Sequence, residues 1–176
     1  MNLYNIASTI IPLQTMDPIR KTKQWKDRNR DVLKVVKRFK EVAKENPLYS
    51  LVDPECVKRT LMTLPLDNVC LWYDREDNLV ALLVYAIGQD WWSNEVCVSE
   101  ALTLIVDTKW AGIQREAIKE LERVAHAYGA RMITAGNALA PIDKKALVGN
   151  GYRKQGYNIH YDAFIKVLEG EQKDDN

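Results

Sequence analysis

Hydrophobic positions recur at helical spacing in the first third of the chain. From Asp31 onward, apolar residues return every three or four positions and most of the intervening residues are lysines and arginines, which predicts an amphipathic helix. Asp31 is the expected N-cap, and the Asn46–Pro47 pair is expected to end the helix. A second, shorter helix is predicted to follow Asp53–Pro54 and to end before Pro65.

The middle of the chain changes to apolar runs of strand length. Val69–Tyr73 and Leu79–Ile87 flank the polar segment Asp74–Asn78, which has the length and composition of a hairpin turn. A third strand is expected over Val96–Val106, where the last residues form a continuous apolar run typical of a buried strand.

Helical spacing then returns over a longer segment. Apolar residues from Ile113 to Tyr128 form one stripe, and Gly129 follows where helices favour a left-handed residue. Three shorter elements are expected after this helix: a strand at Arg131–Ala135, a helix from Asp143 to about Val148 that ends at Gly149 and Gly151, and a closing strand with period two from Tyr157 to Val167.

This order of elements defines a fold class. A strand–helix–strand unit implies a parallel pair of strands, whereas a hairpin implies antiparallel pairs. The sequence therefore predicts an α/β fold: a single domain over residues 31–168 with a mixed, mostly antiparallel sheet flanked by helices. Residues 1–30 are expected to add a short strand near Ile10 and Ile11 and a basic segment to the same domain, and residues 169–176 to form a flexible polar tail.

Composition narrows the class of protein. The chain has 176 residues, of which 47% are hydrophobic and 28% charged, as expected for one globular domain. Its longest apolar run, Leu79–Ile87, is too short to cross a bilayer, and no signal-peptide pattern is present. Two histidines and three cysteines without CxxC spacing offer no metal site. We therefore expect a cytoplasmic protein without membrane association, in which the three cysteines are buried and the histidines are structural or face solvent.

One segment departs from the near-neutral net charge of +1. Arg20–Lys44 contains eleven lysines and arginines but only three acidic residues. It could be an electrostatic footprint for nucleic acid or another polyanion, or simply the solvated outer face of an amphipathic helix. We favour the second interpretation, because no aromatic pattern for base stacking accompanies the charges.

Three stretches carry a resemblance to a known family. They are Glu100–Val106, then Lys109–Gln114 leading into the helix Arg115–Ala127, and finally Ala146–Tyr152 followed by Tyr157–Leu168, which ends in Lys166-Val167-Leu168. Together with the order of elements, they resemble the GNAT superfamily of acyl-CoA N-acyltransferases over roughly Asp31 to Leu168. Small phage-encoded members commonly end in this way, so the resemblance also implies a phage origin and a host cytoplasm.

The resemblance implies acetyl-CoA as the co-substrate. It would lie along Leu104, Ile105 and Val106, with its diphosphate at the start of the following helix. A helix N-terminus offers unpaired N–H groups and a partial positive charge, and glycine lets the backbone approach a phosphate closely. The residues implied at this loop are Lys109, Gly112, Ile113 and Gln114. Gln114 stands where the family has a small residue, and the link from Val106 to Lys109 is about two residues shorter than usual for the family, so the loop is degenerate.

The resemblance also implies catalytic roles. Glu100 corresponds to the carboxylate that deprotonates the acceptor amine in many family members. The usual tyrosine that protonates the leaving thiolate is replaced by Leu147, which leaves Tyr152 or Tyr157 as candidates for the general acid, although Tyr161 is also near. Trp91 and Trp92 could form a wall of the acceptor pocket, or they could instead pack in the core and over the sheet edge.

Two functions therefore remain open at the level of sequence. The first is an N-acetyltransferase that moves an acetyl group from acetyl-CoA to an amine of unknown identity, on a small molecule or a protein. The second is a catalytically inactive GNAT-fold protein with a binding or structural role. Gln114, Leu147 and the shortened loop motivate the second function.

Overall fold

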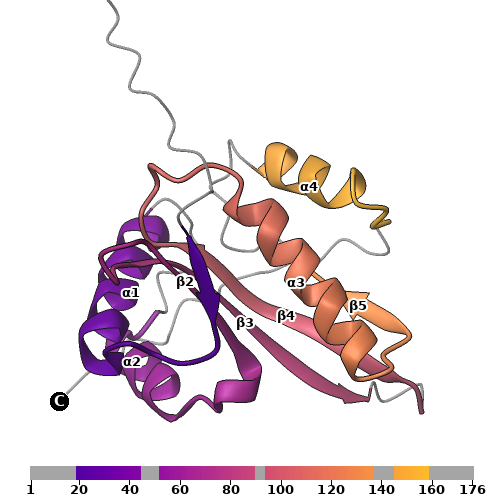
Figure 1. Cartoon of the computed structure of the whole chain (residues 1–176), viewed down its shortest axis with the longest axis horizontal. Coiled ribbons are helices and arrows are strands. Elements are labelled where there is room, and N and C mark those ends of the chain that lie inside the picture. The colour runs from indigo at the N-terminus through magenta and orange to yellow at the C-terminus, as the bar shows by residue number, and fades with distance from the viewer. Residues whose placement is uncertain (1–18, 45–51, 90–93, 137–144, 159–176) are drawn as a thin grey trace, which may run out of the picture.

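A five-stranded sheet with strand order β1-β2-β3-β4-β5 forms the centre of the computed structural model (Figure 1). The structure describes residues 19–44, 52–89, 94–136 and 145–158. The elements within them are β1 (Arg20–Thr22), α1 (Arg28–Ala43), α2 (Pro54–Thr63), the 3-10 turn η2 (Leu66–Asn68), β2 (Val69–Tyr73), β3 (Leu79–Gln89), β4 (Val96–Ile105), α3 (Ile113–Ala127), β5 (Met132–Thr134) and α4 (Lys145–Arg153).

The sheet is mixed, as predicted. Strands β1 to β4 pair in antiparallel fashion, and β5 pairs with β4 in parallel after the crossover through α3. Strand β1 was not predicted, because its sequence Arg20-Lys21-Thr22 has no apolar residue. It extends the sheet by pairing along Leu71–Tyr73 of the buried strand β2.

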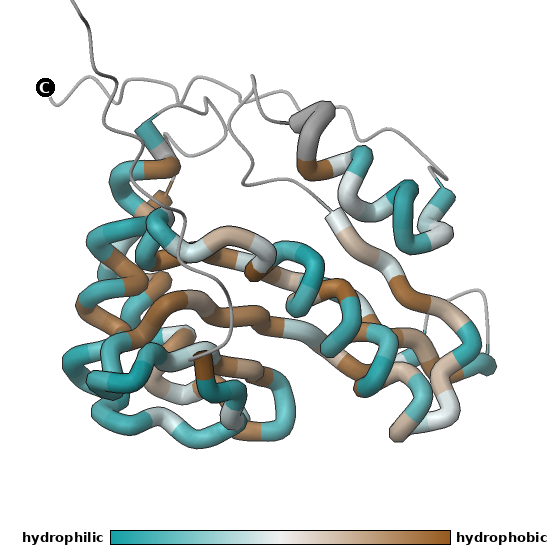
Figure 2. Tube along the Cα trace, turned by 45° about the horizontal axis from the view of Figure 1, so that its top comes forward, coloured by the Kyte–Doolittle hydropathy of each residue, from teal (hydrophilic) through white to brown (hydrophobic). Residues whose placement is uncertain are grey.

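The sheet separates two hydrophobic layers. In β2, Cys70 and Trp72 pack toward α3, whereas Val69, Leu71 and Tyr73 pack toward α1 and α2. This alternation follows from the two-residue period of a strand and makes every residue of β2 buried. The helices alternate hydrophobic and hydrophilic positions, whereas the central strands are mostly hydrophobic (Figure 2).

Helix α1 begins earlier than the sequence pattern predicts. Its N-cap is Asp27, whose carboxylate accepts a hydrogen bond from the backbone N–H of Arg30 at 3.0 Å. The prediction that Asp31 caps the helix is therefore wrong. Asp31 lies one turn inside the helix with 0% of its surface exposed, and it accepts a hydrogen bond from the Tyr73 hydroxyl at 2.6 Å. Asp27 and Asp31 are both residues of a type that can cap a helix. The hydrogen bond from Tyr73 of β2 shows that Asp31 has a different role.

Helix α4 ends later than predicted. It continues through Gly149 and Gly151 to Arg153, and the left-handed residue that follows it is Gly156, with φ of 86°. Glycine weakens a helix by only about 1 kcal/mol. The side chain of Tyr152 is only 7% exposed, and its burial offsets that cost, so the helix continues beyond both glycines.

Other expectations have mixed outcomes. Cys70 and Cys97 are buried as expected, whereas Cys56 is exposed on α2, so its predicted burial is wrong. His126 faces solvent.

Some predictions concern residues that the structure does not describe. The predicted strand near Ile10, the Trp91–Trp92 pair and the closing strand from residue 159 onward lie outside the described residues. Among the helices that the structure describes, none has the length and apolar character needed to cross a membrane.

Candidate active site

Strands β4 and β5 pair over only a short distance. Cys97, Val98 and Ser99 of β4 face Met132, Ile133 and Thr134 of β5, and β5 ends there. Strand β4 continues to Ile105 paired with β3 alone, so within the described residues its other edge carries no strand. Strands β4 and β5, which α3 connects, therefore stop pairing just before Glu100, and the predicted cofactor residues Leu104 and Ile105 lie on the part of β4 whose second edge carries no described strand.

Strand β4 contains a β-bulge just after its pairing with β5 ends. Tyr85 pairs with Glu100 and the preceding residue Val84 pairs with Leu102, which leaves Ala101 as the extra residue. In a regular strand, Glu100 and Thr103 would point to opposite faces. Because of the bulge they share a face, and the Thr103 hydroxyl donates a hydrogen bond to the Glu100 carboxylate.

The Glu100 carboxylate is the centre of a hydrogen-bond network that joins β4, the segment after β5 and α4. Its Oε2 accepts the Tyr152 hydroxyl of α4 at 2.5 Å and the backbone N–H of Gly136, just beyond β5, at 3.1 Å. With Thr103, three segments of the chain thus supply donors to one half-buried carboxylate. The structure brings together the predicted base Glu100 and the predicted acid Tyr152, which are 52 positions apart in the sequence.

Tyr152 keeps its proton in this environment. Burial raises the pKa of the Tyr152 hydroxyl, and the neighbouring Glu100 charge raises it further. A second hydrogen bond of the Tyr152 hydroxyl comes from Gln114 at the start of α3, whose Nε2 donates to the Tyr152 oxygen at 3.0 Å. This neutral phenol can donate a proton, but ionises with difficulty unless another group stabilises the anion.

Tyr157, the other candidate acid, lies beside Tyr152 without joining the network. The two rings meet edge to face with centroids 5.4 Å apart. Burial raises the pKa of Tyr157 to about 12, and its buried hydroxyl has no hydrogen-bond partner among the described residues. Leu147 lies in the same helix as Tyr152, within α4.

The N-terminus of α3 is open to solvent. Gly112 occupies the N-cap position in the left-handed region, with φ of 85°, and no side chain among the described residues caps the helix. The side chain of Ile113 is fully buried, so this residue offers only its backbone to a ligand. Unpaired N–H groups at an uncapped helix start fit a diphosphate.

Lys109 is not directed to the helix N-terminus by any contact that the structure shows. Its ammonium group lies 3.1 Å from the Asp107 carboxylate and 5.8 Å from the Trp110 ring centre. The hydrogen bond with Asp107 raises the pKa of Lys109. The lysine thus offsets the charge of the neighbouring aspartate, which would otherwise repel a phosphate.

Several residues of the site were not foreseen from the sequence. Thr103 reaches Glu100 only because of the bulge, and Gly136 does so only because β5 ends beside it. Arg38 of α1 donates through Nε to the Ile105 carbonyl at 3.2 Å and so ties the end of β4 to the opposite layer. No local sequence signal marks these contacts, because they depend on the bulge in β4 or on where a distant element lies.

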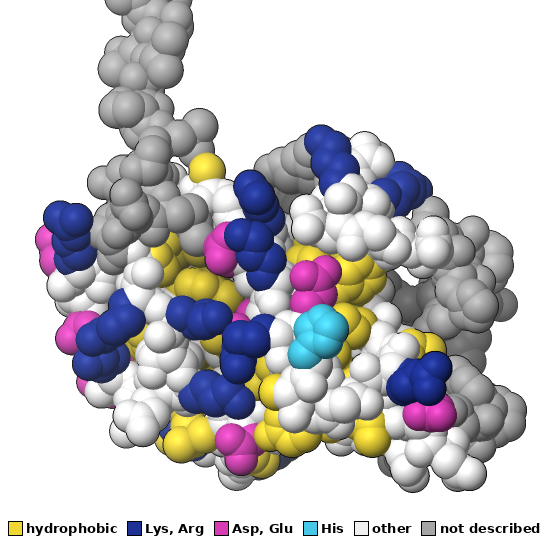
Figure 3. Space-filling model, turned by 45° about the vertical axis from the view of Figure 1, so that its right-hand side comes forward, with side chains coloured by type: hydrophobic (Ala, Val, Ile, Leu, Met, Phe, Trp, Pro, Cys, Tyr) yellow, Lys and Arg dark blue, Asp and Glu magenta, His cyan; other side chains and the backbone are white. Residues whose placement is uncertain are grey.

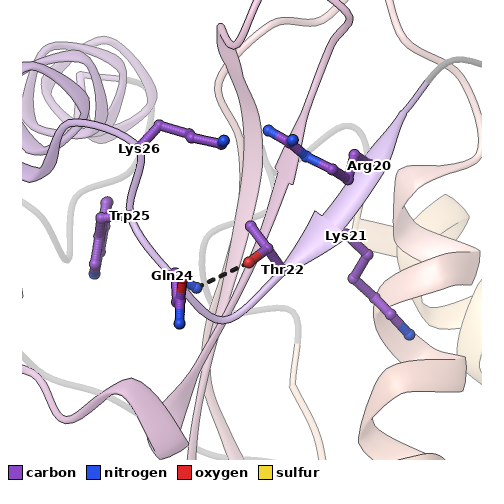
Figure 4. A pocket seen from close by; sticks show the side chains of 6 residues that line it. All are labelled: Arg20, Lys21, Thr22, Gln24, Trp25 and Lys26. Carbon is purple, nitrogen blue, oxygen red and sulfur yellow. Dashed lines mark hydrogen bonds between the residues drawn. The ribbon is translucent and has the colours of Figure 1, made fainter.

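The basic segment Arg20–Lys44 is largely engaged within the molecule. Figure 3 shows lysine and arginine side chains gathered on one face, with acidic side chains among them. Arg20 and Lys26 both pair with Asp77, and Lys21 pairs with the buried Glu120. A pocket of about 280 Å³ is lined by Arg20, Lys21, Thr22, Gln24, Trp25 and Lys26. Figure 4 shows the side chains of Arg20 and Lys26 pointing toward one another.

Comparison with known proteins identifies the fold. No protein-family model matches the sequence, and a sequence comparison with curated proteins finds no match. Solved structures do match: a possible acetyltransferase from Clostridium difficile 630 has a TM-score of 0.59 at 17% identity, covering 86% of this chain and 97% of the other. An aminoglycoside acetyltransferase from an uncultured soil metagenomic sample gives 0.58 at 17% identity, covering 86% and 95%. Glucosamine-6-phosphate N-acetyltransferase from Arabidopsis thaliana gives 0.55 at 14% identity, covering 86% and 99%. The chain has the GNAT acetyltransferase fold.

Proposed function

We propose that this protein is an N-acetyltransferase that uses acetyl-CoA and transfers the acetyl group to an amine. The observation that carries the proposal is the direct hydrogen bond between Glu100 and Tyr152, next to the position where β4 and β5 stop pairing. A proton acceptor and a proton donor thus lie side by side, next to an open helix N-terminus that fits a diphosphate. The shared fold supports the proposal, although a fold alone does not establish an activity.

The chain's own residues divide the binding task between two elements. The backbone N–H groups of Gly112, Ile113 and Gln114 hold the diphosphate at the start of α3. The free edge of β4, from Ala101 to Ile105, offers backbone groups to the extended arm of the co-substrate, as a sheet edge does to a strand. Acetyl-CoA supplies the acetyl group as a thioester.

Glu100 and Tyr152 move the protons of the reaction. The amine nitrogen forms a bond to the thioester carbonyl carbon, and Glu100 accepts the proton that the nitrogen loses. As the carbon–sulfur bond breaks, Tyr152 donates its hydroxyl proton to the sulfur. The proton on Glu100 then passes to the Tyr152 oxygen along their 2.5 Å hydrogen bond, which restores both residues. The products are an acetylated amine and free coenzyme A thiol.

The acceptor is an amine, and amino sugars are a suitable first choice for an assay. Two similar structures are named for acetylation of an aminoglycoside and of glucosamine-6-phosphate. Their identities to this chain are 17% and 14%, so they guide the choice of compounds only.

The test is a thiol-release assay with acetyl-CoA and a panel of amines, including amino sugars, polyamines and peptides. Glu100→Gln and Tyr152→Phe should each lower kcat by about 100-fold, as expected when a general base or acid is removed. Tyr157→Phe is the matched control, because this neighbouring hydroxyl has no described partner, and it should keep kcat within about threefold of the original protein.

Two results would count against this function. Transfer that persists in Glu100→Gln and Tyr152→Phe would show that the pair does not move the protons. A folded protein without transfer to any amine would favour the alternative, a non-catalytic GNAT-fold binding protein. That alternative is favoured by one observation, the pairing of Lys109 with Asp107 instead of an open cation at the helix N-terminus.

A further inference from the structure

Gln114 has an unexpected contact at the start of α3. It is the second residue of the helix, next to Gly112 and Ile113, at the position where the resemblance implies a small residue. Its side chain is half-buried and reaches α4, where Nε2 lies 3.0 Å from the Tyr152 oxygen. The side chain is therefore held toward the Glu100 network.

The direction of these hydrogen bonds follows from the chemistry of the three groups. An ionised carboxylate can only accept, so the single hydroxyl proton of Tyr152 goes to Glu100. The Tyr152 oxygen is then left as an acceptor, and among the described residues the amide NH2 of Gln114 supplies the second hydrogen bond. The order of donation is Gln114 to Tyr152 to Glu100.

Tyr152 also has a second acceptor within reach. The Gly136 carbonyl oxygen lies 3.4 Å from its hydroxyl, compared with 2.5 Å for Glu100. A hydroxyl proton rotates to suit its neighbours. A donor held on the oxygen restricts that rotation and so reinforces the preference for Glu100 over the Gly136 carbonyl.

We propose that Gln114 is a positioning residue whose side-chain amide orients the Tyr152 hydroxyl toward Glu100 and stabilises the Tyr152 oxygen once its proton has left. The catalytic consequence rests on the proposed acetyl transfer, whereas the orientation itself does not. Because the backbone N–H of Gln114 belongs to the helix start that fits a diphosphate, one residue serves both the binding of the co-substrate and the proton donor.

The electrostatics of Tyr152 agree with this role. Burial and the Glu100 charge raise the pKa of Tyr152, and the hydrogen bond from Gln114 acts in the opposite direction. A donor aimed at a phenolate is charge-assisted and stronger than one aimed at a neutral hydroxyl. The contribution of Gln114 is therefore larger after Tyr152 has given up its proton than before.

The test compares the original protein with Gln114→Met, which keeps the length of the side chain but removes both N–H donors. Gln155→Met is the matched control, because Gln155 is an exposed glutamine just after α4. The first measurement is the proton NMR resonance of the Tyr152 hydroxyl, assigned by its loss in Tyr152→Phe. In Gln114→Met this proton should shift and exchange with water about tenfold faster, as expected for the loss of one hydrogen bond. Gln155→Met should leave it unchanged.

The second measurement is the kinetics of acetyl transfer. Gln114→Met should lower kcat about tenfold while KM for acetyl-CoA stays within about threefold, because the backbone groups at the helix start are retained. The alkaline limb of the pH profile should move to higher pH, because Tyr152 loses the one hydrogen bond that lowers its pKa.

The two measurements separate the two claims. A hydroxyl resonance that is absent in the original protein, or identical in Gln114→Met, would overturn the positioning role. Tighter binding of acetyl-CoA by Gln114→Met without a loss of kcat would overturn it as well, since Gln114 would then be an obstruction. If the resonance changes as expected but the original protein transfers no acetyl group, the positioning stands and the proposed function fails.

Discussion

The buried carboxylates of Asp31 and Glu120 each accept a hydrogen bond from another element, in addition to one from a neighbour on their own helix. Removing an ionised carboxylate from water is costly unless hydrogen bonds replace the lost solvent. Among the described residues, the pairs that meet this requirement join segments far apart in the sequence: Asp31 with Tyr73, Glu120 with Lys21, and the half-buried Glu100 with Tyr152. The same physical demand therefore links α1 to β2, α3 to β1 and β4 to α4.

The Asp31–Tyr73 contact gives a prediction about stability. The Tyr73 hydroxyl donates to Asp31 at 2.6 Å, and both side chains are fully buried. Tyr73→Phe should lower the free energy of unfolding by about 1–3 kcal/mol, because the buried Asp31 side chain would lose a hydrogen-bond donor. Urea unfolding measures this difference, with Tyr128→Phe as the control because Tyr128 is exposed. A change in Tyr73→Phe no larger than in the control would contradict the assigned role of this hydrogen bond.

At the scale of elements, α3 joins the core and the candidate site. Its inward face, which includes Ala117, Leu121 and Val124, is buried against the sheet. Its N-terminus is exposed to solvent and follows the part of β4 that pairs with β3 alone. Glycines in the left-handed region stand at both ends, Gly112 with φ of 85° and Gly129 with φ of 63°. The helix is fixed by its core face, which leaves its first turn available to a ligand.

The two glycines provide a matched pair of substitutions. Gly112→Ala and Gly129→Ala should each lower the free energy of unfolding by about 1 kcal/mol, because alanine is strained at positive φ. Only Gly112→Ala should also weaken acetyl-CoA binding, because only this end of α3 faces the proposed diphosphate site. Thermal unfolding and calorimetric titration measure the two effects. Equal affinities in the two variants would place the diphosphate elsewhere.

The sequence predicted those elements whose pattern is strong and local. The α3 stripe, the hairpin of β2 and β3, and the short helix α2 between Asp53 and Pro65 agree with the structure, because each depends on residues that are close in the chain. Strand β1 was not predicted, because this polar segment forms a strand by pairing with the edge of β2 and not through a hydrophobic pattern of its own. The two layers on opposite faces of the sheet follow from the period of the strands.

The candidate site was predictable in its parts but not in its connections. Glu100 and Tyr152 were both candidates, yet nothing local to either residue shows that they meet. The bulge at Ala101 changes which side chains share a face of β4, and no residue type marks it in advance. The contact from Gln114 to Tyr152 depends on how α4 packs against α3.

At the scale of the whole molecule, one ion-pair cluster fastens the edge of the sheet to a helix. Glu120 of α3 is 2% exposed and accepts hydrogen bonds from Lys21 of β1 at 2.6 Å and from Arg123 at 2.6 and 2.8 Å. Burial alone would raise the pKa of Glu120, but the bonds from Arg123 and Lys21 outweigh burial and lower it. The first strand is thereby anchored to α3 by charge as well as by backbone pairing.

This cluster predicts a pH dependence. A carboxyl group whose pKa is lowered by folding stabilises the protein above its ordinary pKa of about 4.3, and this stabilisation is lost as the pH falls through the folded value. Glu120→Gln should therefore be about 1–3 kcal/mol less stable at neutral pH. The gap should narrow at pH values below about 4. Urea unfolding across this range provides the measurement.

The control for this prediction is Glu116→Gln on the same helix. Glu116 forms a more exposed pair with Lys119, so its loss should change the free energy of unfolding by less than about 0.5 kcal/mol at any pH. A gap between the original protein and Glu120→Gln that stays constant down to pH 3 or so would contradict the cluster's role.

Binding of acetyl-CoA, measured by isothermal titration calorimetry, tests the central claim most directly. If the open start of α3 and the free edge of β4 form a co-substrate site, the protein should bind one acetyl-CoA per chain with a Kd between about 1 µM and 1 mM. Coenzyme A, which shares the diphosphate, should compete for the same site. The absence of saturable binding at millimolar acetyl-CoA, with the protein folded, would contradict the account and leave only the shared fold.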